Sequence, residues 1–384
     1  MILLTSCYLH DSNNQYKTKD LLFSVNLNEL HKNNEPIYYS EVFESFYLLP
    51  LETNPNCIIG NIKHIKVYNT DIFILDSYSK LIYIFQQNGK FINKVGSFGR
   101  GPREYLDPIF SFDEETNEVV VYCKQLKKII IYKINGDFIK EFKYENGYQI
   151  KNIECHNDYI YITINPLPKD KEKHYLIYSI DKNGNEIDKW LKNRGIYSTM
   201  EVSHMGSFYR YNDKLLYNES YLDTIYYFEN NKLYPYLSAF SNSASYLEEI
   251  EAIHKIKEID KRISEMWKYK RIWGRHDLIE NNQLMYFIYI KDNQSYSLMY
   301  NKLNKKISTG FFVDDMSGYI NERFISCNDN YFMGIMRNLP FSNINTFQQA
   351  IENREIIVSE IERNKAFTIS IEDNPVLIFY KIKK

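Results

Sequence analysis

The amino-acid sequence predicts an all-β fold, a six-bladed β-propeller built from four-stranded blades. The main signal is a set of two-residue turn pairs, which are Asn88-Gly89, Asn135-Gly136, Asn183-Gly184, Asn230-Asn231 and, more weakly, Asn304-Lys305. Counted at the second residue, the intervals between the pairs are 47, 48, 47 and 74 residues. Propeller blades repeat at about 40–50 residues, so the first three intervals fit consecutive blades, and the last fits one blade with roughly 27 inserted residues.

The residues around each turn support this interpretation. An apolar and aromatic run precedes each turn and a short strand follows it, as in Leu81–Phe85 and Phe91–Val95. Asn and Gly tolerate the positive φ that a type I′ turn requires at both central positions. Each hairpin is therefore predicted to form the two outer strands of a blade. A pair upstream, such as Ile62–Tyr68 with Asp71–Leu75, then forms the inner strands.

The sixth blade predicts how the ring closes. Its third strand, Val376–Ile382, lies at the C-terminus, and no residues remain for a fourth. An N-terminal strand can supply it, from either Leu22–Leu27 or Phe46–Leu51, and both alternatives stay open. Pairing the N- and C-terminal strands would remove the free edges that an open sheet exposes. We therefore expect residues 1–20 to form a tether and residues 21–384 the propeller.

Two stretches break the strand pattern and predict helical inserts, at about residues 245–271 and 346–365. Both are highly charged and carry apolar residues near helical spacing. In a propeller, the two connections that they occupy emerge on the same face. The inserts, the loop of residues 192–205 and the segment around Arg100 are therefore predicted to share one rim of the central channel, and function is expected there.

The charge and residue composition exclude several classes of function. The 47 Lys and Arg nearly balance the 49 Asp and Glu, which gives no general attraction to nucleic acid or anionic membranes. No apolar run reaches the ~18 residues of a membrane-spanning helix. The sequence contains neither C-x-x-C nor H-E-x-x-H, so we expect no metal site and no cofactor. The cysteines after the first are interpreted as buried free thiols, with an oxidised pair as the alternative.

The first cysteine suggests a lipid anchor. Leu4-Thr5-Ser6-Cys7 resembles a bacterial lipobox, in which small residues precede the cysteine that is lipidated. Met1-Ile2-Leu3 supplies neither a basic region nor an apolar segment, so the start is trimmed or the true initiator lies upstream. A chance cysteine is the alternative. The polar residues 10–20 fit a tether, and we expect attachment to the cell envelope through this lipid only.

A distinctive stretch carries a resemblance to a known family. Gly96-Ser97-Phe98-Gly99-Arg100-Gly101-Pro102-Arg103-Glu104-Tyr105, with Leu51-Glu52-Thr53, Cys57-Ile58-Ile59-Gly60 and Asn374-Pro375-Val376-Leu377, resembles the six-bladed β-propeller lipoproteins of Bacteroidetes. That family relates more loosely to NHL and TolB-like propellers. The sequence departs from the family at Arg103, where glycine is expected. The resemblance implies a propeller in the envelope, outer membrane or periplasmic face, and implies no particular activity.

Candidate ligand-binding residues lie in two segments. In the Gly96–Tyr105 loop, Arg100, Arg103 and Tyr105 are candidates for holding an anionic or sugar ligand, and Arg100 could grip a carboxylate with two hydrogen bonds. The alternative is a structural turn whose glycines supply positive φ, with Arg100 paired to Glu104 or to a neighbouring blade. The loop lacks the P-loop pattern and its strand–helix context, so a phosphate cradle is not expected.

The second segment opens blade five. Trp273, Arg275 and His276 place an aromatic ring beside cations, which suits stacking on a sugar or gripping a peptide. His204, in the long loop, is the remaining candidate near the channel. The alternatives are that Trp273 anchors the helical insert and that both histidines are hydrogen-bonded structural residues.

These observations favour a non-catalytic binding or scaffold module whose partner is a glycan, a peptide or an envelope protein. The alternative is a hydrolase or lyase that acts on glycan or peptide, with a site assembled between blades. The sequence has no G-x-S-x-G nucleophile elbow to support it, and paired acids such as Asp314-Asp315 usually sit in water. An envelope sensor or assembly factor is a third possibility, and it predicts an exposed apolar patch on the inserts.

The lipid anchor is directly testable. When the gene is expressed with its native upstream sequence, Cys7→Ala should move the protein from the membrane to the soluble fraction, because the acylated sulfur is lost. Fractionation beside the unchanged protein measures this. Undiminished membrane retention of the variant would contradict the anchor.

Overall fold

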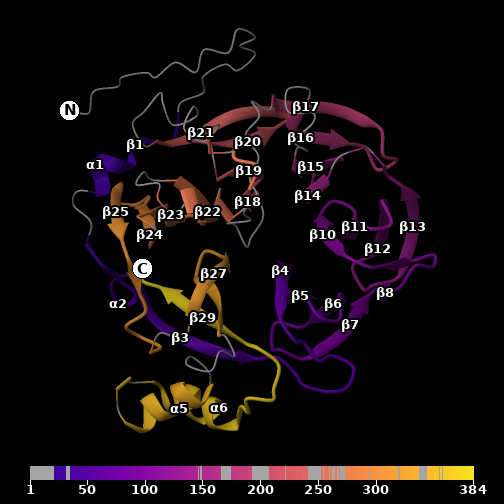
Figure 1. Cartoon of the computed structure of the whole chain (residues 1–384). Helices are drawn as coiled ribbons and strands as arrows, with labels where there is room; N and C mark the ends of the chain where they lie inside the picture. Colours follow the sequence, from indigo (N-terminus) through magenta and orange to yellow (C-terminus); the bar gives the residue numbers. More distant parts are fainter. Residues whose placement is uncertain are drawn as a thin grey trace.

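Six four-stranded blades stand in a ring, so the predicted six-bladed propeller is confirmed (Figure 1). Within each blade, the four neighbouring strands are antiparallel and the first strand lies nearest the axis. The computed structural model describes residues 21–384 apart from 32–34, 146, 148, 166–173, 193–206, 221, 241–251, 254, 259, 262–263, 266–267, 269–272, 293, 319–320, 337–343, 354 and 357.

The first three blades follow the chain without interruption. Blade one consists of β4 (Ile62–Tyr68), β5 (Asp71–Asp76), β6 (Ile82–Phe85) and β7 (Phe91–Val95). Blade two consists of β10 (Pro108–Asp113), β11 (Glu118–Cys123), β12 (Lys128–Lys133) and β13 (Phe138–Lys143). Between these blades lies a short parallel pair, β8 (Ser97–Phe98) and β9 (Glu104–Tyr105). Blade three consists of β14 (Gln149–His156), β15 (Tyr159–Asn165), β16 (Tyr175–Ile180) and β17 (Glu186–Lys192).

The other three blades recruit residues from the N-terminus. Blade four consists of β18 (Phe208–Tyr211), β19 (Lys214–Tyr217), β20 (Thr224–Glu229) and β21 (Lys232–Phe240), to which β1 (Ser24–Asn26) adds in parallel. Blade five consists of β22 (Trp273–Glu280), β23 (Leu284–Lys291), β24 (Gln294–Asn301) and β25 (Lys306–Gly310). Blade six consists of β27 (Asn321–Cys327), β28 (Tyr331–Met336), β29 (Val376–Ile382) and β3 (Phe43–Pro50).

The closing strand is thus β3, close to the second of the two predicted alternatives. It pairs with β29 from Val376↔Pro50 to Ile382↔Phe43. The other alternative, around residues 22–27, forms β1 instead and extends blade four. From β1 the chain follows the outer edge of the ring through α1 (Leu27–His31), β2 (Ile37–Tyr38), which pairs with β26 (Phe312–Val313), and α2 (Tyr39–Val42).

The buried side chain of Asn374 fixes the start of blade one to the last blade. Its amide nitrogen donates to the carbonyls of Glu52 and Cys57, each at 2.6 Å, and its oxygen accepts from the Ile59 amide at 2.7 Å. These bonds use all but one of the side chain's hydrogen-bonding positions. The connection from β3 to β4 is therefore held to the strand that ends the ring.

Three hairpins differ from the predicted type I′ turn. In these turns only the glycine has positive φ, at 82° for Gly89, 93° for Gly136 and 89° for Gly184. Each glycine amide donates to the residue three positions earlier, and the pairing register shifts beside the turn. The geometry is a turn followed by a left-handed glycine in a bulge. Asn230 and Asn231 both have positive φ, as predicted.

The same glycines form joints between neighbouring blades. A Cβ atom on Gly89 would lie 2.1 Å from the Pro50 carbonyl oxygen, at the end of β3. One on Gly136 would lie 2.4 Å from the Lys94 oxygen at the end of β7, and one on Gly184 would lie 3.0 Å from the Phe142 ring on β13. Each hairpin therefore packs against the end of the preceding blade's outer strand, at a distance that excludes a larger residue.

Apolar side chains fill every interface between neighbouring blades. The described core divides into six clusters, and each one joins residues of two adjacent blades, including the pair formed by blades six and one. The two middle strands of a blade, such as β11 and β12, are buried on both faces, which explains their continuous apolar sequence. Burial at about 25 cal/mol per Å² makes these interfaces the main stabilising term.

The second predicted insert forms two helices, α5 (Ile344–Glu352) and α6 (Glu360–Thr368), but it lies elsewhere than expected. The helices lie at the periphery against β3 and not on the channel rim (Figure 1). The Glu362 carboxylate accepts the Leu48 amide, and Lys365 donates to the Leu48 carbonyl at 3.2 Å. The insert therefore covers an outer strand that would otherwise be free. Most of the first predicted insert, residues 245–271, lies outside the described residues.

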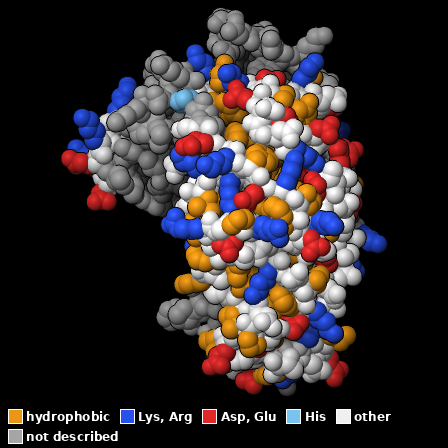
Figure 2. Space-filling view, turned by 90° about the vertical axis from the view of Figure 1, so that its right-hand side faces the viewer, with side chains coloured by type: hydrophobic (Ala, Val, Ile, Leu, Met, Phe, Trp, Pro, Cys, Tyr) orange, Lys and Arg blue, Asp and Glu red, His pale blue; other side chains and the backbone are white. Residues whose placement is uncertain are grey.

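The outer rim mixes both signs of charge. On the side shown in Figure 2, Lys and Arg alternate with Asp and Glu among hydrophobic side chains, in line with the net charge of −2. Within the described part of the chain, no helix is long and apolar enough to cross a membrane.

The joint between blades can be tested with two glycines that share a left-handed backbone. Gly136→Ala should lower the free energy of unfolding by about 1–3 kcal/mol more than Gly147→Ala, because its methyl group must displace the Lys94 carbonyl. Gly147 has φ 74° and nothing within 4 Å of a Cβ atom, so it carries only the backbone cost of about 1 kcal/mol. Urea unfolding of both variants gives the difference. Equal losses would contradict the joint.

Candidate functional site

The candidate residues of the Gly96–Tyr105 loop separate into exposed and buried groups. Arg100 and Arg103 are exposed, whereas Tyr105 is fully buried between blades one and two. The Tyr105 hydroxyl donates to the Val95 carbonyl and accepts the Ile82 amide at 3.3 Å. Burial raises its pKa above the ordinary value. Tyr105 thus fixes the loop to blade one through its hydrogen bonds, and its buried side chain is not exposed to a ligand.

Arg103 occupies the position at which the resemblance leads us to expect glycine. Its φ is 63°, in the left-handed region that glycine favours. The exposed side chain lies over the Phe138 ring, with the guanidinium 4.7 Å from the ring centre, and its backbone is held on both sides. The amide donates to Glu141 at 2.9 Å and the carbonyl accepts from the Tyr132 hydroxyl at 2.8 Å. The loop therefore keeps the path that glycine would allow.

Arg275 and His276 are buried in β22. The Arg275 guanidinium donates to the Asn218 side chain at 2.9 Å and to the carbonyls of Leu222, Asp223 and Ala239. This residue joins blade five to blade four. His276 Nε2 lies 4.0 Å from Asp277 Oδ2. Both side chains are therefore enclosed by the blades, and the hydrogen bonds of Arg275 serve the contact between blades four and five.

Three further candidates lie outside the description. Cys7 and His204 belong to segments that the structure leaves out, and the same holds for the Trp273 side chain, although its backbone begins β22. Their predicted roles in lipidation and ligand binding stay predictions.

An exposed apolar group on the face that carries the connections between blades escaped the sequence analysis. Its members come from three neighbouring segments, with exposed fractions of 77% for Tyr78, 59% for Ile58 and 54% for Phe98. We call these residues together with Arg100 the loop surface. The Ser77 amide donates to the Asn61 carbonyl and the Tyr105 hydroxyl contacts Ile82, so all three segments border blade one. The sequence feature that could have identified this group is the presence of large apolar residues in loops rich in Gly, Asn and Ser.

A group of cations lies beside the loop surface. Lys63 Nζ is 2.9 Å from Asp107 Oδ1, and the Lys124 amide donates to the Asp107 carbonyl at 3.2 Å. Burial disfavours the charge of Asp107, but the hydrogen bond and charge of Lys63, with the charges of Lys124 and Lys80, hold its pKa below the ordinary value. Three ammonium groups therefore act on a single carboxylate.

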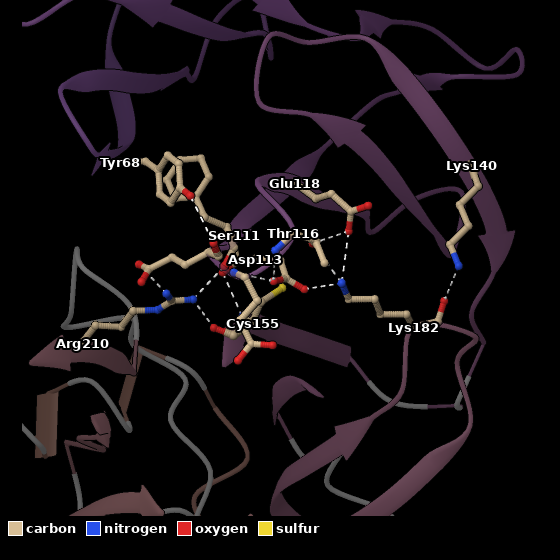
Figure 3. Close-up of polar contacts among 12 residues, drawn as sticks. Tyr68, Ser111, Asp113, Thr116, Glu118, Lys140, Cys155, Lys182 and Arg210 are labelled. Carbon is tan, nitrogen blue, oxygen red and sulfur yellow. Dashed lines mark hydrogen bonds and ion pairs between the residues drawn. The ribbon is translucent and has the colours of Figure 1, made fainter. Parts of the chain in front are cut away.

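A second polar cluster, also missed, lies near the axis, where the inner strands of four blades meet. Buried Glu154 accepts a hydrogen bond from Ser111 at 2.9 Å and forms ion pairs with Lys66 and Arg210. Arg210 also pairs with Glu114 and donates to the carbonyls of Phe112 and Cys155 (Figure 3). These residues come from β4, β10, β14, β18 and the turn after β10, so no segment of sequence contains the cluster.

The network continues outward through blades two and three. Lys182, in the last hairpin of blade three, pairs with Asp113 and Glu118 of blade two and accepts from Lys140 of β13 at its carbonyl (Figure 3). Charges in these blades are thus matched from the axis to the outer strand.

His156 lies at the edge of the axial cluster. Burial, followed by the positive charge of Arg210, lowers its pKa to about 4, so the ring is neutral near pH 7. Among the described residues, its Nε2 has no hydrogen-bond partner. Arg210 Nε lies 3.2 Å from Glu154 but is not aligned for a hydrogen bond. A neutral imidazole could serve as a base, yet among the described residues no hydroxyl or thiol forms a hydrogen bond with its Nε2.

The axial cluster is built to join blades. Glu154 accepts hydrogen bonds from Ser111 and Lys66 and forms an ion pair with Arg210. The neighbouring Cys155 has its pKa raised to about 12 by burial and by Glu154, so it is a poor nucleophile. Within the described residues no three His, Cys, Asp or Glu side chains are grouped as a metal site. The arrangement therefore matches charges across four blades and supplies no paired nucleophile and base.

The coupling between Arg210 and Glu154 can be measured. Arg210→Met should lower the free energy of unfolding by about 3 kcal/mol, because it leaves a buried carboxylate with too few partners. Glu154→Gln should also destabilise, and the double variant should lose at least about 1 kcal/mol less than the sum. Chemical unfolding of all four proteins completes the cycle. Additive losses would contradict a shared network.

Comparison with solved structures finds the same fold. A crystal structure named "Putative exported protein" from Bacteroides fragilis NCTC 9343 matches with TM-score 0.74 and 17% identity over 91% of this chain and 98% of that one. A DUF4221 member from Bacteroides vulgatus matches with TM-score 0.49 and 13% identity, over 89% and 97% of the two chains. A catalytically inactive virginiamycin B lyase from Staphylococcus aureus with quinupristin reaches 0.40 and 16%, over 70% and 75%. The first match supports the fold, and the other two are too distant to support an argument.

A comparison with curated proteins finds no match. The family described as "Domain of unknown function (DUF4934)" matches residues 22–381, almost the whole of the described propeller. The chain therefore belongs to the DUF4934 family.

Proposed function

We propose that this propeller is a non-catalytic module of the cell envelope that binds a ligand or protein partner through the loop surface. The observation that carries the proposal is the exposure of Tyr78, Phe98 and Ile58 beside the unburied Arg100. Exposed apolar residues gathered on one face are typical of interaction sites. Aromatic and Arg side chains are also the types that contribute most at binding interfaces.

The rest of the molecule favours binding over catalysis. The titratable groups near the axis are engaged with one another, and the most deeply buried of the sequence candidates, Tyr105 and Arg275, serve the packing of blades. A hydrolase or lyase would need a nucleophile or base open to substrate. Among the described residues, the axial cluster pairs its charges with one another and supplies neither a nucleophile nor a base open to substrate.

The proposed location rests on two separate lines of support. The lipobox-like sequence ending at Cys7 suits a lipid anchor, and the name of the Bacteroides fragilis relative refers to export. The first described residues lead into β1 at the outer edge of blade four. A tether arriving there would attach the ring at its edge and leave both faces accessible.

Ligand-induced stabilisation tests the binding role. The full chain is screened for a thermal shift against oligosaccharides, peptides and divalent metals, where a ligand at ~100 times its dissociation constant adds roughly 2.7 kcal/mol. A hit should disappear in Tyr78→Ala and Arg100→Ala, which remove exposed contacts. Phe367→Ala is the matched control, since Phe367 is also exposed but lies on α6.

Normal binding of the ligand by Tyr78→Ala and Arg100→Ala would contradict the proposal. A shift that survives both substitutions places the site elsewhere. If no small ligand shifts the protein, a photoreactive residue at position 78 should crosslink an envelope protein in cells, and one at position 367 should not. Absence of both a shift and a crosslink would contradict the proposed function.

A further inference from the structure

The loop surface has an excess of positive charge, although the whole chain is slightly acidic. Lys63, Lys80 and Lys124 lie around one carboxylate, that of Asp107, and the exposed Arg100 adds a fourth cation on the same face. Within the described part of the chain, no carboxylate lies within ion-pair distance of Arg100. An anionic ligand would therefore find complementary charge here.

Two other carboxylates of these loops accept backbone amides, whereas Glu52, which accepts the Phe91 amide, is exposed. Asp76 accepts the amides of Gly60 and Asn61 at 3.0 and 2.8 Å and that of Ser79 at 2.6 Å. Glu104 accepts the Gly101 amide at 2.7 Å. Their charges are compensated by backbone donors, so they subtract little from the positive field outside. The same bonds also occupy these four amides, which are therefore not available to the main chain of a peptide.

The aromatic part of the surface is held in place. The Tyr78 ring lies against Gly60, where a Cβ atom would come within 2.6 Å of ring atom Cδ2 and 3.1 Å of Cγ. The ring is nevertheless 77% exposed, so most of its surface is open to solvent. Gly60 does not have positive φ, so its role here is to leave room for this ring.

We propose that the ligand of the loop surface is an acidic polysaccharide, with a sugar ring packed on Tyr78 and its carboxylate or sulfate groups held by Arg100 and the neighbouring lysines. This inference rests on the proposed function and specifies its ligand. An aromatic ring with an open surface packs against the C–H face of a sugar, and the cations pair with its charges. One mode of peptide recognition adds a strand to an exposed sheet edge, and the strands of these loops, β8 and β9, are only two residues long.

The test uses the full chain in affinity electrophoresis with polygalacturonate as the acidic glycan. Retardation is expected, and Tyr78→Ala and Arg100→Gln should each weaken binding about tenfold, as for interface residues that carry much of the affinity. Gly60→Ala should weaken it as well, because the added methyl group displaces the Tyr78 ring without removing it. Rising salt should weaken binding through screening of the charges. Phe367→Ala should bind normally.

Two comparison ligands separate this inference from the proposed function. Equal binding of fully methyl-esterified pectin would overturn the requirement for acidic groups, yet it would keep a glycan-binding surface. Binding of polyglutamate or anionic phospholipid vesicles, with no binding of polygalacturonate or dextran sulfate, would overturn the glycan and leave the loop surface as a site. Failure of all of these ligands would overturn the inference, while the crosslink from position 78 decides the proposed function independently.

Discussion

The contact between each hairpin glycine and the end of the preceding blade's outer strand is the constraint on which the ring depends. At Gly89 and Gly136 the neighbouring atom is a backbone oxygen, which cannot move aside as a side chain can. The contact requires a residue without Cβ and the positive φ that glycine adopts without strain. The hairpin of blade four contacts blade three in a different way, because the side chain of Asn231 accepts a hydrogen bond from Tyr161 of blade three. A repeat of 47 or 48 residues is thus the distance between successive joints.

This constraint explains why the residues that resemble a family reveal architecture and not activity. The segments around Glu52 and Cys57 meet Asn374, which bonds to both, where the first blade is fixed to the last. The Gly96–Tyr105 segment packs through Tyr105 between blades one and two. These segments are needed for closing the ring, whatever the ligand. A resemblance that rests on them indicates a propeller, and the site must be identified from the side chains that point away from these contacts.

The sequence predicted the parts of the fold that depend on local pattern. The period, the hairpins and the closure of the ring by an N-terminal strand follow from turn residues and alternation, whereas the choice between residues 22–27 and 46–51 required the structure. Burial was not predictable in the same way: Tyr105 and Arg275 stand in polar segments, and only the neighbouring blades enclose them. The cluster at Glu154 was out of reach because its partners Lys66 and Arg210 are 88 and 56 positions away in the sequence. Tyr78 was not predicted as a site residue for another reason: a single apolar residue in a loop does not by itself indicate a function.

The loops that carry the exposed residues are held by hydrogen bonds of buried or half-buried side chains to backbone groups. Asp76 accepts the Ser79 amide next to Tyr78 and the Gly60 amide of the adjacent segment, and Glu104 with Tyr105 holds the segment that presents Phe98 and Arg100. A surface already ordered by its own hydrogen bonds loses little conformational entropy on binding. The amides of Gly60, Ser79 and Gly101 are occupied, however, so recognition has to come mainly from side chains. A flat aromatic ring and long flexible cations recognise repeated rings and charges better than they recognise one defined shape, and this favours a polymeric ligand over a small metabolite.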